Sequence, residues 1–251
     1  MNVVKDLDAW SEVFIIDPIT KPIVTRLAKV KWLKPYHVSL CSLIVGFSSS
    51  LLFLLHHNII AGILWFGAII LDGIDGKLAR TRRQYLFIHA VLDQLFDQLI
   101  ISSFVLATII VMPSHTPYIV LLLILLYIFE VTYALRMEFA SKHSDNRTSE
   151  HKPQDIVSRY EEYLNIIKNS ISSTFLHSVL SFIDKVHRIT LRYRTFPYPK
   201  ISDVRFLITL YLLYPNILIL YLCILFAIPD LVISIFLLWS TARHLEVQYN
   251  G

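Results

Sequence analysis

Four aspartates stand at helical spacing in a stretch of the chain that is otherwise apolar. Asp72 and Asp75 are three residues apart, and Asp93 and Asp97 are four residues apart. Residues three or four apart on an α-helix share one face. A carboxylate in a membrane span costs about 2.5–3.5 kcal/mol on insertion scales, so an acid in such a place is functional by default. The sequence therefore predicts two acidic pairs on the faces of two consecutive helices.

A hairpin between these two helices would bring the acidic pairs together. The basic turn centres near residue 84, nine residues after Asp75 and nine residues before Asp93. Folding the hairpin at this turn sets Asp75 opposite Asp93 and Asp72 opposite Asp97. At about 1.5 Å per residue, the acids lie roughly 14–19 Å from the turn. That depth suits the floor of a cavity that opens on the side of the turn.

Carboxylates that face each other repel unless they are protonated or bridged by cations. All-oxygen ligation without clustered His or Cys favours Mg²⁺, Mn²⁺ or Ca²⁺ over zinc. Two such ions about 3.5–4 Å apart would grip a diphosphate and assist an oxygen displacement at phosphorus. Gly73 and Gly76 leave room beside the acids for a bulky ligand, and Arg80 is placed to pair with phosphate oxygens. Hydrogen bonding between helices and a cation or proton pathway are the alternative roles for the acids.

The whole chain has the composition of a membrane protein. Of its 251 residues, 55% are hydrophobic and 17% are charged, against roughly 45–50% and about 25% in soluble domains. The apolar runs predict six spans. These are Val38–Leu55, Ile59–Leu71 (continuing as a helix to Arg80), Leu86–Met112, Tyr118–Leu135, Val204–Leu213 and Ile217–Trp239. The run Val204–Leu213 is too short alone, so it must borrow preceding residues or be shielded by protein.

The positive charges predict the topology. All 23 Lys and Arg fall in four blocks: six in residues 5–34, four in 77–83, twelve in 136–205, and Arg243. With six spans, the four blocks share one side, which is the cytoplasmic side by the positive-inside rule. We therefore expect an all-α, multi-pass integral membrane protein with six transmembrane helices, both termini in the cytoplasm and the acidic site facing the cytoplasm.

The same charge and hydropathy pattern divides the chain into four parts. Residues 1–37 form an N-terminal arm that includes an amphipathic surface helix, for which a solvated basic arm is the alternative. Residues 38–140 hold the first four spans with the acidic motif. Residues 141–200 are a cytoplasmic insertion with apolar residues at helical spacing. Residues 201–251 hold the last two spans and the C-terminal tail.

The motif residues resemble those of the CDP-alcohol phosphotransferase family, also called CDP-alcohol phosphatidyltransferases. Its signature is D-x-x-D-G-x-x-A-R-x8-G-x3-D-x3-D. The matching residues are Asp72, Asp75, Gly76, Ala79, Arg80, Asp93 and Asp97. Residues 35–39 look like the family's Pro-Asn-x-x-Thr segment, and the surface helix and six spans resemble its architecture. The chain departs from the pattern at His89, which replaces the second glycine, at Tyr36, which replaces an asparagine, and at Leu86, which replaces a small hydroxyl residue.

The resemblance implies an enzyme that moves a substituted phosphate group from a CDP-alcohol to an acceptor hydroxyl and releases CMP. It implies that two Mg²⁺ or Mn²⁺ ions are held by Asp72, Asp75, Asp93 and Asp97, with Asp97 also the general base. The residues expected at the CDP site are Gly76, Ala79, Arg80, His89, His37 and Tyr36. Three arginines are candidates for binding a phosphorylated acceptor, with anchoring of the spans as the alternative: Arg136, Arg205 and Arg243.

The substrate classes and partners follow from the same resemblance. We favour a CDP-lipid donor such as CDP-diacylglycerol and a small polar acceptor, in phospholipid or related polar lipid synthesis. A soluble CDP-polyol donor or an altered nucleotide remains open. A cation-coupled transporter and a catalytically silent scaffold that uses residues 141–200 are alternatives of another class. We expect membrane lipids and a second copy of the chain, in a homodimer, as partners, and no nucleic acid.

Overall fold

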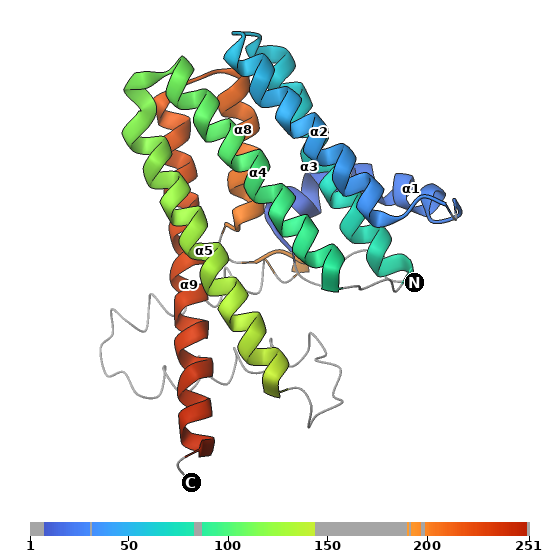
Figure 1. Ribbon diagram of the computed structural model, residues 1–251, viewed down its shortest axis with the longest axis vertical. Helices are drawn as coiled ribbons and strands as arrows, with labels where there is room; N and C mark the ends of the chain where they lie inside the picture. Colours follow the sequence, from blue (N-terminus) through green and yellow to red (C-terminus); the bar gives the residue numbers. More distant parts are fainter. Residues whose placement is uncertain are drawn as a thin grey trace.

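Helices make up most of the structure, a computed structural model that describes residues 8–30, 32–82, 87–143, 190, 192–196 and 199–249. No β-strand occurs among these residues. In chain order (Figure 1) the helices are η1 Glu12–Ile16, α1 Asp17–Leu27, α2 Pro35–Leu54, α3 Asn58–Arg82, α4 Phe87–Val111, η2 Pro113–His115, α5 Thr116–His143, α8 Ile201–Leu213 and α9 Ile217–Tyr249. The all-α prediction is therefore confirmed for the described part of the chain.

Five stretches of the described helices are long and apolar enough to cross a membrane. They are Pro35–Leu54 in α2, Asn58–Arg82 in α3, Gln94–Val111 in α4, Pro113–Thr132 in η2 and α5, and Ile217–Ile235 in α9. Each overlaps a span that the sequence predicts. The remaining predicted span, Val204–Leu213, falls on α8, which has 13 residues.

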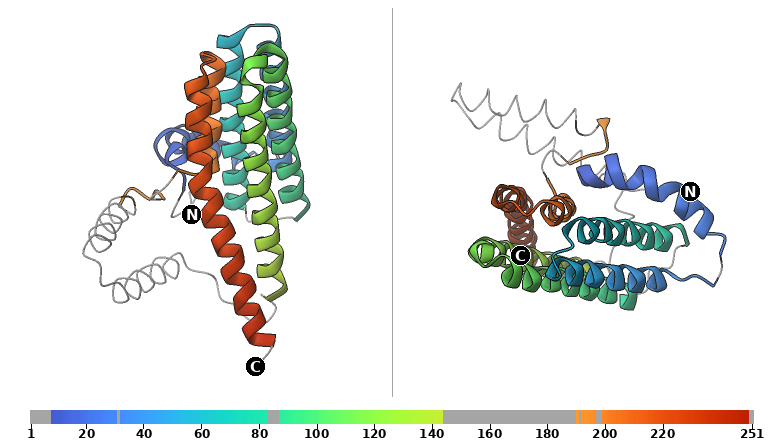
Figure 2. Two further views of the ribbon diagram at one scale, coloured as in Figure 1. Left: turned by 90° about the vertical axis from the view of Figure 1, so that its left-hand side faces the viewer. Right: turned by 90° about the horizontal axis from the view of Figure 1, so that it is seen from above.

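Helix α8 is enclosed by other helices. It packs against α3 and α9, and Figure 2 shows it between these two helices. The side chains of Val204, Ile208 and Tyr211 are fully buried. A Cβ added at Gly62 of α3 would lie 2.5 Å from the Leu213 side chain, so glycine allows the two helices to approach this closely. Protein contacts thus cover a helix too short to span a bilayer alone.

Four aromatic side chains join α2, α3, α4 and α8 in the core. The rings of Trp65 and Phe104 have centroids 5.3 Å apart, and Tyr211 lies 5.9 Å from Phe104 and 6.2 Å from Phe53. All four residues are at most 2% exposed. Tilted and edge-on pairs at such distances add to the stability gained by burial. This cluster sets the positions of the helices that carry the acidic site.

The long helices lie in a bundle, and α1 runs crosswise to it (Figures 1 and 2). Helix α2 packs on α3 and α4, while α5 packs on α9. Helices α5 and α9 extend beyond the others at one end. The outer face of α2 exposes Leu40, Ile44 and Phe47. An apolar outer face of this kind suits contact with acyl chains.

The N-terminal segment is fastened to the residues that lead into α8. Trp10 Nε1 donates to the carbonyl of Phe196 at 2.7 Å, and the backbone N–H of Ser11 donates to Asp203 Oδ1 at 2.7 Å. Asp203 Oδ2 also accepts from the backbone N–H of Lys200, which caps α8. Segments almost 200 residues apart in the sequence are therefore held together beside the acidic helices.

Arg82 fixes the connection between α1 and α2 to the end of α3. Its guanidinium donates to the carbonyl oxygens of Leu27, Ala28, Val30 and Leu33. These groups include orphan carbonyls at the C-terminus of α1, which the helix cannot satisfy itself. A cation at this end is also favoured by the helix dipole.

Candidate functional site

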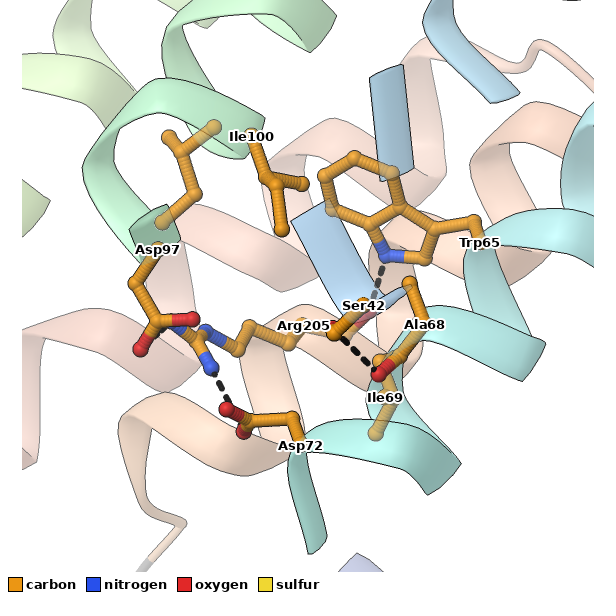
Figure 3. Close-up of a pocket in the computed structure, with 9 residues that line it drawn as sticks. Ser42, Trp65, Ala68, Ile69, Asp72, Asp97, Ile100 and Arg205 are labelled. Carbon is orange, nitrogen blue, oxygen red and sulfur yellow. Dashed lines mark hydrogen bonds and ion pairs between the residues drawn. The ribbon is translucent and has the colours of Figure 1, made fainter. Parts of the chain in front are cut away.

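Asp72 of α3 and Asp97 of α4 meet at the guanidinium of Arg205 of α8. Arg205 Nη1 donates to Asp72 Oδ2 at 3.2 Å, and Nη2 forms an ion pair with Asp97 Oδ2. The side chain of Arg205 is 15% exposed, and those of Asp72 and Asp97 are 26% and 23% exposed. Figure 3 shows the guanidinium between the two carboxylates. Three helices thus place two acids and one cation at a single point.

A small cavity of about 20 Å³ adjoins this cluster. Its walls combine the charged groups with apolar side chains (Figure 3): Ser42, Trp65, Ala68, Ile69, Asp72, Asp97, Ile100, Ile101 and Arg205. Trp65 Nε1 donates to the backbone carbonyl of Arg205 at 3.1 Å, and Ser42 Oγ donates to the carbonyl of Ala68 at 2.9 Å. These bonds hold α8 and α2 against α3, so the backbone positions around the cluster are fixed.

The other two motif aspartates lie on the same helices. Asp75 is one turn beyond Asp72 on α3 and is 3% exposed. Asp93 is one turn before Asp97 on α4, but its side chain lies outside the described residues. Within the described part of the chain, no three His, Cys, Asp or Glu side chains cluster closely enough to hold a metal ion.

The carboxylate oxygens of Asp72 and Asp97 are suitable ligands for a hard divalent cation. Asp72 and Asp97 present carboxylate oxygens to one positively charged group, and neither His nor Cys takes part. Mg²⁺ and Mn²⁺ prefer carboxylate oxygen ligands of this kind. The residues therefore suit such an ion chemically, with Arg205 as the cation that they bind in this structure.

Gly76 and Gly73 have different surroundings on α3. Among the described residues, a Cβ added at Gly76 would meet only Arg80 Nη1 within 4 Å, at 3.6 Å. A Cβ at Gly73 would lie 2.8 Å from Ile16 Cγ2 of η1. Gly76 therefore leaves space, as the sequence predicts, whereas Gly73 makes room for helix packing and not for a ligand.

Arg80 and Ala79 lie on the last turns of α3, half-buried. The Nε atom of Arg80 is buried and makes no hydrogen bond within the part of the chain that the structure describes. A buried donor without a partner is costly, so this position favours a ligand that can accept a hydrogen bond. Ala79 keeps the neighbouring surface small.

Tyr36 and His37 form the first turn of α2. His37 Nδ1 accepts a hydrogen bond from the backbone N–H of Lys34 at 3.1 Å, which caps the helix. The Tyr36 and His37 rings have centroids 4.0 Å apart, and Tyr36 is 37% exposed. His37 therefore has a structural role in capping, which the sequence alone does not indicate. The side chains of His89, Arg136 and Arg243 lie outside the described residues.

Three polar contacts near the site were not predicted from the sequence. Lys77, inside the motif, is 2% exposed, and its Nζ lies 3.2 Å from Glu12 Oε2 and 3.1 Å from Asp17 Oδ1. Gln94 Nε2 donates to Glu130 Oε2 of α5. Only the burial of charged residues among apolar ones hints at these pairs, because their partners are remote in the sequence.

A known protein family matches the part of the chain that carries the four motif aspartates. The family model described as CDP-alcohol phosphatidyltransferase matches residues 32–182, more than half of the chain. The matched range includes α2 to α5 and all four motif aspartates, but not Arg205 of α8. No curated protein matches the chain.

Proposed function

The chain belongs to the CDP-alcohol phosphatidyltransferase family, which implies transfer of a substituted phosphate group from a CDP-alcohol, and we propose that its donor is a CDP-lipid such as CDP-diacylglycerol. The proposed acceptor is a small polar alcohol, and the second product is CMP. The observation that carries this proposal is the convergence of Asp72 and Asp97 on one cation beside a small cavity in an otherwise apolar bundle. Ionisable side chains within membrane-spanning helices are rare and usually have a function.

Asp97 is the proposed general base. Its carboxylate takes the proton of the acceptor hydroxyl, the acceptor oxygen bonds to the donor phosphorus, and the phosphorus–oxygen bond to CMP breaks. The position of Asp97 at the pocket wall supports this role. Asp72, Asp75, Asp93 and Asp97 are the proposed ligands of Mg²⁺ or Mn²⁺. These ions, when bound, neutralise the charge of the donor diphosphate.

The proposed nucleotide site lies at the end of α3 and the start of α2. The space beside Gly76 and the buried Nε of Arg80 support contact with the CDP group. The other proposed contacts are Ala79, Tyr36, His37 and His89. Arg136, Arg205 and Arg243 remain the proposed group for a phosphorylated acceptor.

The proposed topology has six spans, with both termini and the site on the cytoplasmic side. Burial of α8 between α3 and α9 supports counting it as the fifth span. The crosswise course of α1, which exposes Ile19 and Ile23 beside Lys21, supports a helix that lies on the membrane surface. Acyl chains of a lipid donor would then enter between the apolar outer faces. A homodimer is part of the proposal by analogy with the family.

The test is CMP release by the purified full chain in nanodiscs with Mg²⁺ or Mn²⁺. A panel of CDP-diacylglycerol and soluble CDP-polyols, each with small polar acceptors, separates the donor classes. We expect CMP with the CDP-lipid and none without an acceptor. CMP only with a soluble donor would overturn the lipid assignment. Cation flux in proteoliposomes without CMP release would favour a transporter instead.

A further inference from the structure

Arg205 holds both carboxylates that the proposed function assigns to divalent cations. We propose that Arg205 is an internal counter-ion that competes with divalent cations for Asp72 and Asp97, so that metal loading is an exchange of cations. The inference rests on the proposed metal-binding role of these two aspartates. Arg205 lies outside the range matched by the family model. The competition between Arg205 and divalent cations is therefore argued from the contacts of this chain and not from the family match.

The competition follows from the atoms involved. Arg205 binds Oδ2 of Asp72 and Oδ2 of Asp97, one with each terminal nitrogen. Hard divalent cations bind carboxylate oxygens directly, at about 2.0–2.1 Å for Mg²⁺. A guanidinium in hydrogen-bonding contact with the same oxygens would be repelled by such an ion, strongly so in a half-buried site. The two cations therefore exclude each other at this point.

Only the side chain of Arg205 is free to move in such an exchange. Its carbonyl accepts from Trp65 Nε1 at 3.1 Å. The start of α8 is fixed because the backbone N–H of Ile201 donates to Asp230 Oδ2 at 3.1 Å, and Lys200 Nζ forms an ion pair with Asp230 at 3.1 Å. Helix α8 is thus anchored on two sides, and the exchange requires rotation of the arginine side chain alone.

Glu130 is a further acid that the guanidinium of Arg205 could pair with after it leaves Asp72 and Asp97. It lies on α5, is held by Gln94, and interacts electrostatically with both Arg205 and Asp97. Arg205 is therefore surrounded by acids from three helices, two of which it binds here. When a divalent cation takes Asp72 and Asp97, Glu130 is the acid of a neighbouring helix toward which the guanidinium of Arg205 can turn. This alternative keeps a buried arginine from being left without a counter-charge.

The test measures Mn²⁺ binding to the full chain in nanodiscs after removal of metal with EDTA, using the electron paramagnetic resonance signal of free Mn²⁺. R205Q should bind Mn²⁺ about tenfold or more tightly than the wild type, because each charge-assisted hydrogen bond is worth about one tenfold step in affinity. K200Q is the matched control, since it removes a cation at the start of the same helix, where Lys200 Nζ forms an ion pair with Asp230 and lies 4.2 Å from the centroid of the Phe196 ring. It should leave the Mn²⁺ affinity unchanged.

Thermal unfolding and a second variant, R205K, distinguish a change in Mn²⁺ affinity from a folding defect of R205Q. Mn²⁺ should raise the Tm of R205Q more than that of the wild type, because the variant has no cation of its own between the aspartates. R205K keeps the positive charge but loses the planar guanidinium, whose two terminal nitrogens bind the two aspartates at once. It should therefore bind Mn²⁺ more tightly than the wild type and less tightly than R205Q. If R205Q does not fold, an R205K affinity equal to or weaker than wild type overturns the inference.

The measurements distinguish a failure of the counter-ion inference from a failure of the proposed transferase function. Tighter Mn²⁺ binding by R205Q, together with a wild type that releases no CMP from any donor, would support the counter-ion and reject the transferase. CMP release by the wild type with unchanged or weaker Mn²⁺ binding in R205Q would reject the counter-ion alone. Absence of Mn²⁺ binding in both proteins would also overturn the inference.

Discussion

Lys77 Nζ lies 3.1 Å from Asp17 Oδ1, so the helix that carries the acidic motif is tied to the start of α1 by a buried ion pair. Glu12 completes the contact at 3.2 Å, and Arg194 approaches Asp17 at 3.5 Å from the segment before α8. The crosswise N-terminal helix is therefore part of the architecture of the site. Lys77 pairs with both of these largely buried acids, and Arg194 pairs with Asp17 as well. Loss of Lys77 would therefore leave negative charge inside the protein with less compensation.

Replacing Lys77 with methionine should destabilise the N-terminal segment. Removing one partner of a buried ion pair costs about 3–5 kcal/mol. We expect a lower Tm in detergent and faster proteolysis within residues 8–30. K21M is the matched control, because Lys21 is exposed on α1. Equal unfolding and proteolysis of the two variants would show that the Lys77 contacts contribute little.

Alanine at Gly73 should push η1 away from α3. The added Cβ would lie 2.8 Å from Ile16 Cγ2, and overpacking of this kind costs about 1–3 kcal/mol. Alanine at Gly67 provides the comparison, since its Cβ would meet only Val45 Cγ1, at 3.8 Å, among the described residues. G67A should be neutral or more stable, because alanine favours helix by up to about 1 kcal/mol. Thermal unfolding of both variants measures the difference, and a G73A protein as stable as G67A would contradict the packing role.

Alanine at Gly76 should separate folding from donor binding. The structure leaves space at this position, so the Tm should not fall. If the space belongs to the CDP site, the methyl group should raise KM for the CDP donor while leaving KM for the acceptor unchanged. Steady-state CMP release with each substrate varied in turn provides the measurement. An unchanged donor KM would remove Gly76 from the proposed nucleotide site.

Asparagine at Asp97 keeps the size of the side chain but removes the proposed base. The rate of CMP release should fall by about 10²–10⁴-fold, which is the usual contribution of general acid–base catalysis. S42A is the control within the same pocket, because Ser42 bonds only to the carbonyl of Ala68 in the described contacts. It should stay within a few-fold of the wild type. Activity retained by D97N would assign the base to another residue.

Cysteine labelling tests the proposed orientation in the membrane. His57 lies between α2 and α3, Lys34 lies just before α2, and both are exposed. By the positive-inside rule, an impermeant maleimide added to intact cells should label H57C and not K34C. Permeabilised cells should allow labelling of both. The reverse pattern in intact cells would invert the topology and place the acidic site on the other side.

The helices were predictable because their causes are local. The apolar run Ile59–Leu71 with its continuation to Arg80 became α3, Asn58–Arg82, and Asp72 and Asp97 lie on the two helices that their spacing indicates. Hydropathy, helical period and the turn between two helices all depend on residues that are neighbours in the sequence. The family, too, could be predicted, since its signature is a spacing pattern along two consecutive helices.

Contacts between remote segments were decided only by the tertiary structure. Arg205 is 133 residues from Asp72 in the sequence, yet the two form an ion pair because α8 packs on α3. Gly73 and Gly76 look alike in the motif, but a Cβ at Gly73 would collide with Ile16, whereas a Cβ at Gly76 would make only an ordinary contact with Arg80 among the described residues. A side chain's neighbours depend on which helix faces meet, and helical periodicity fixes the faces of each helix without fixing its partner.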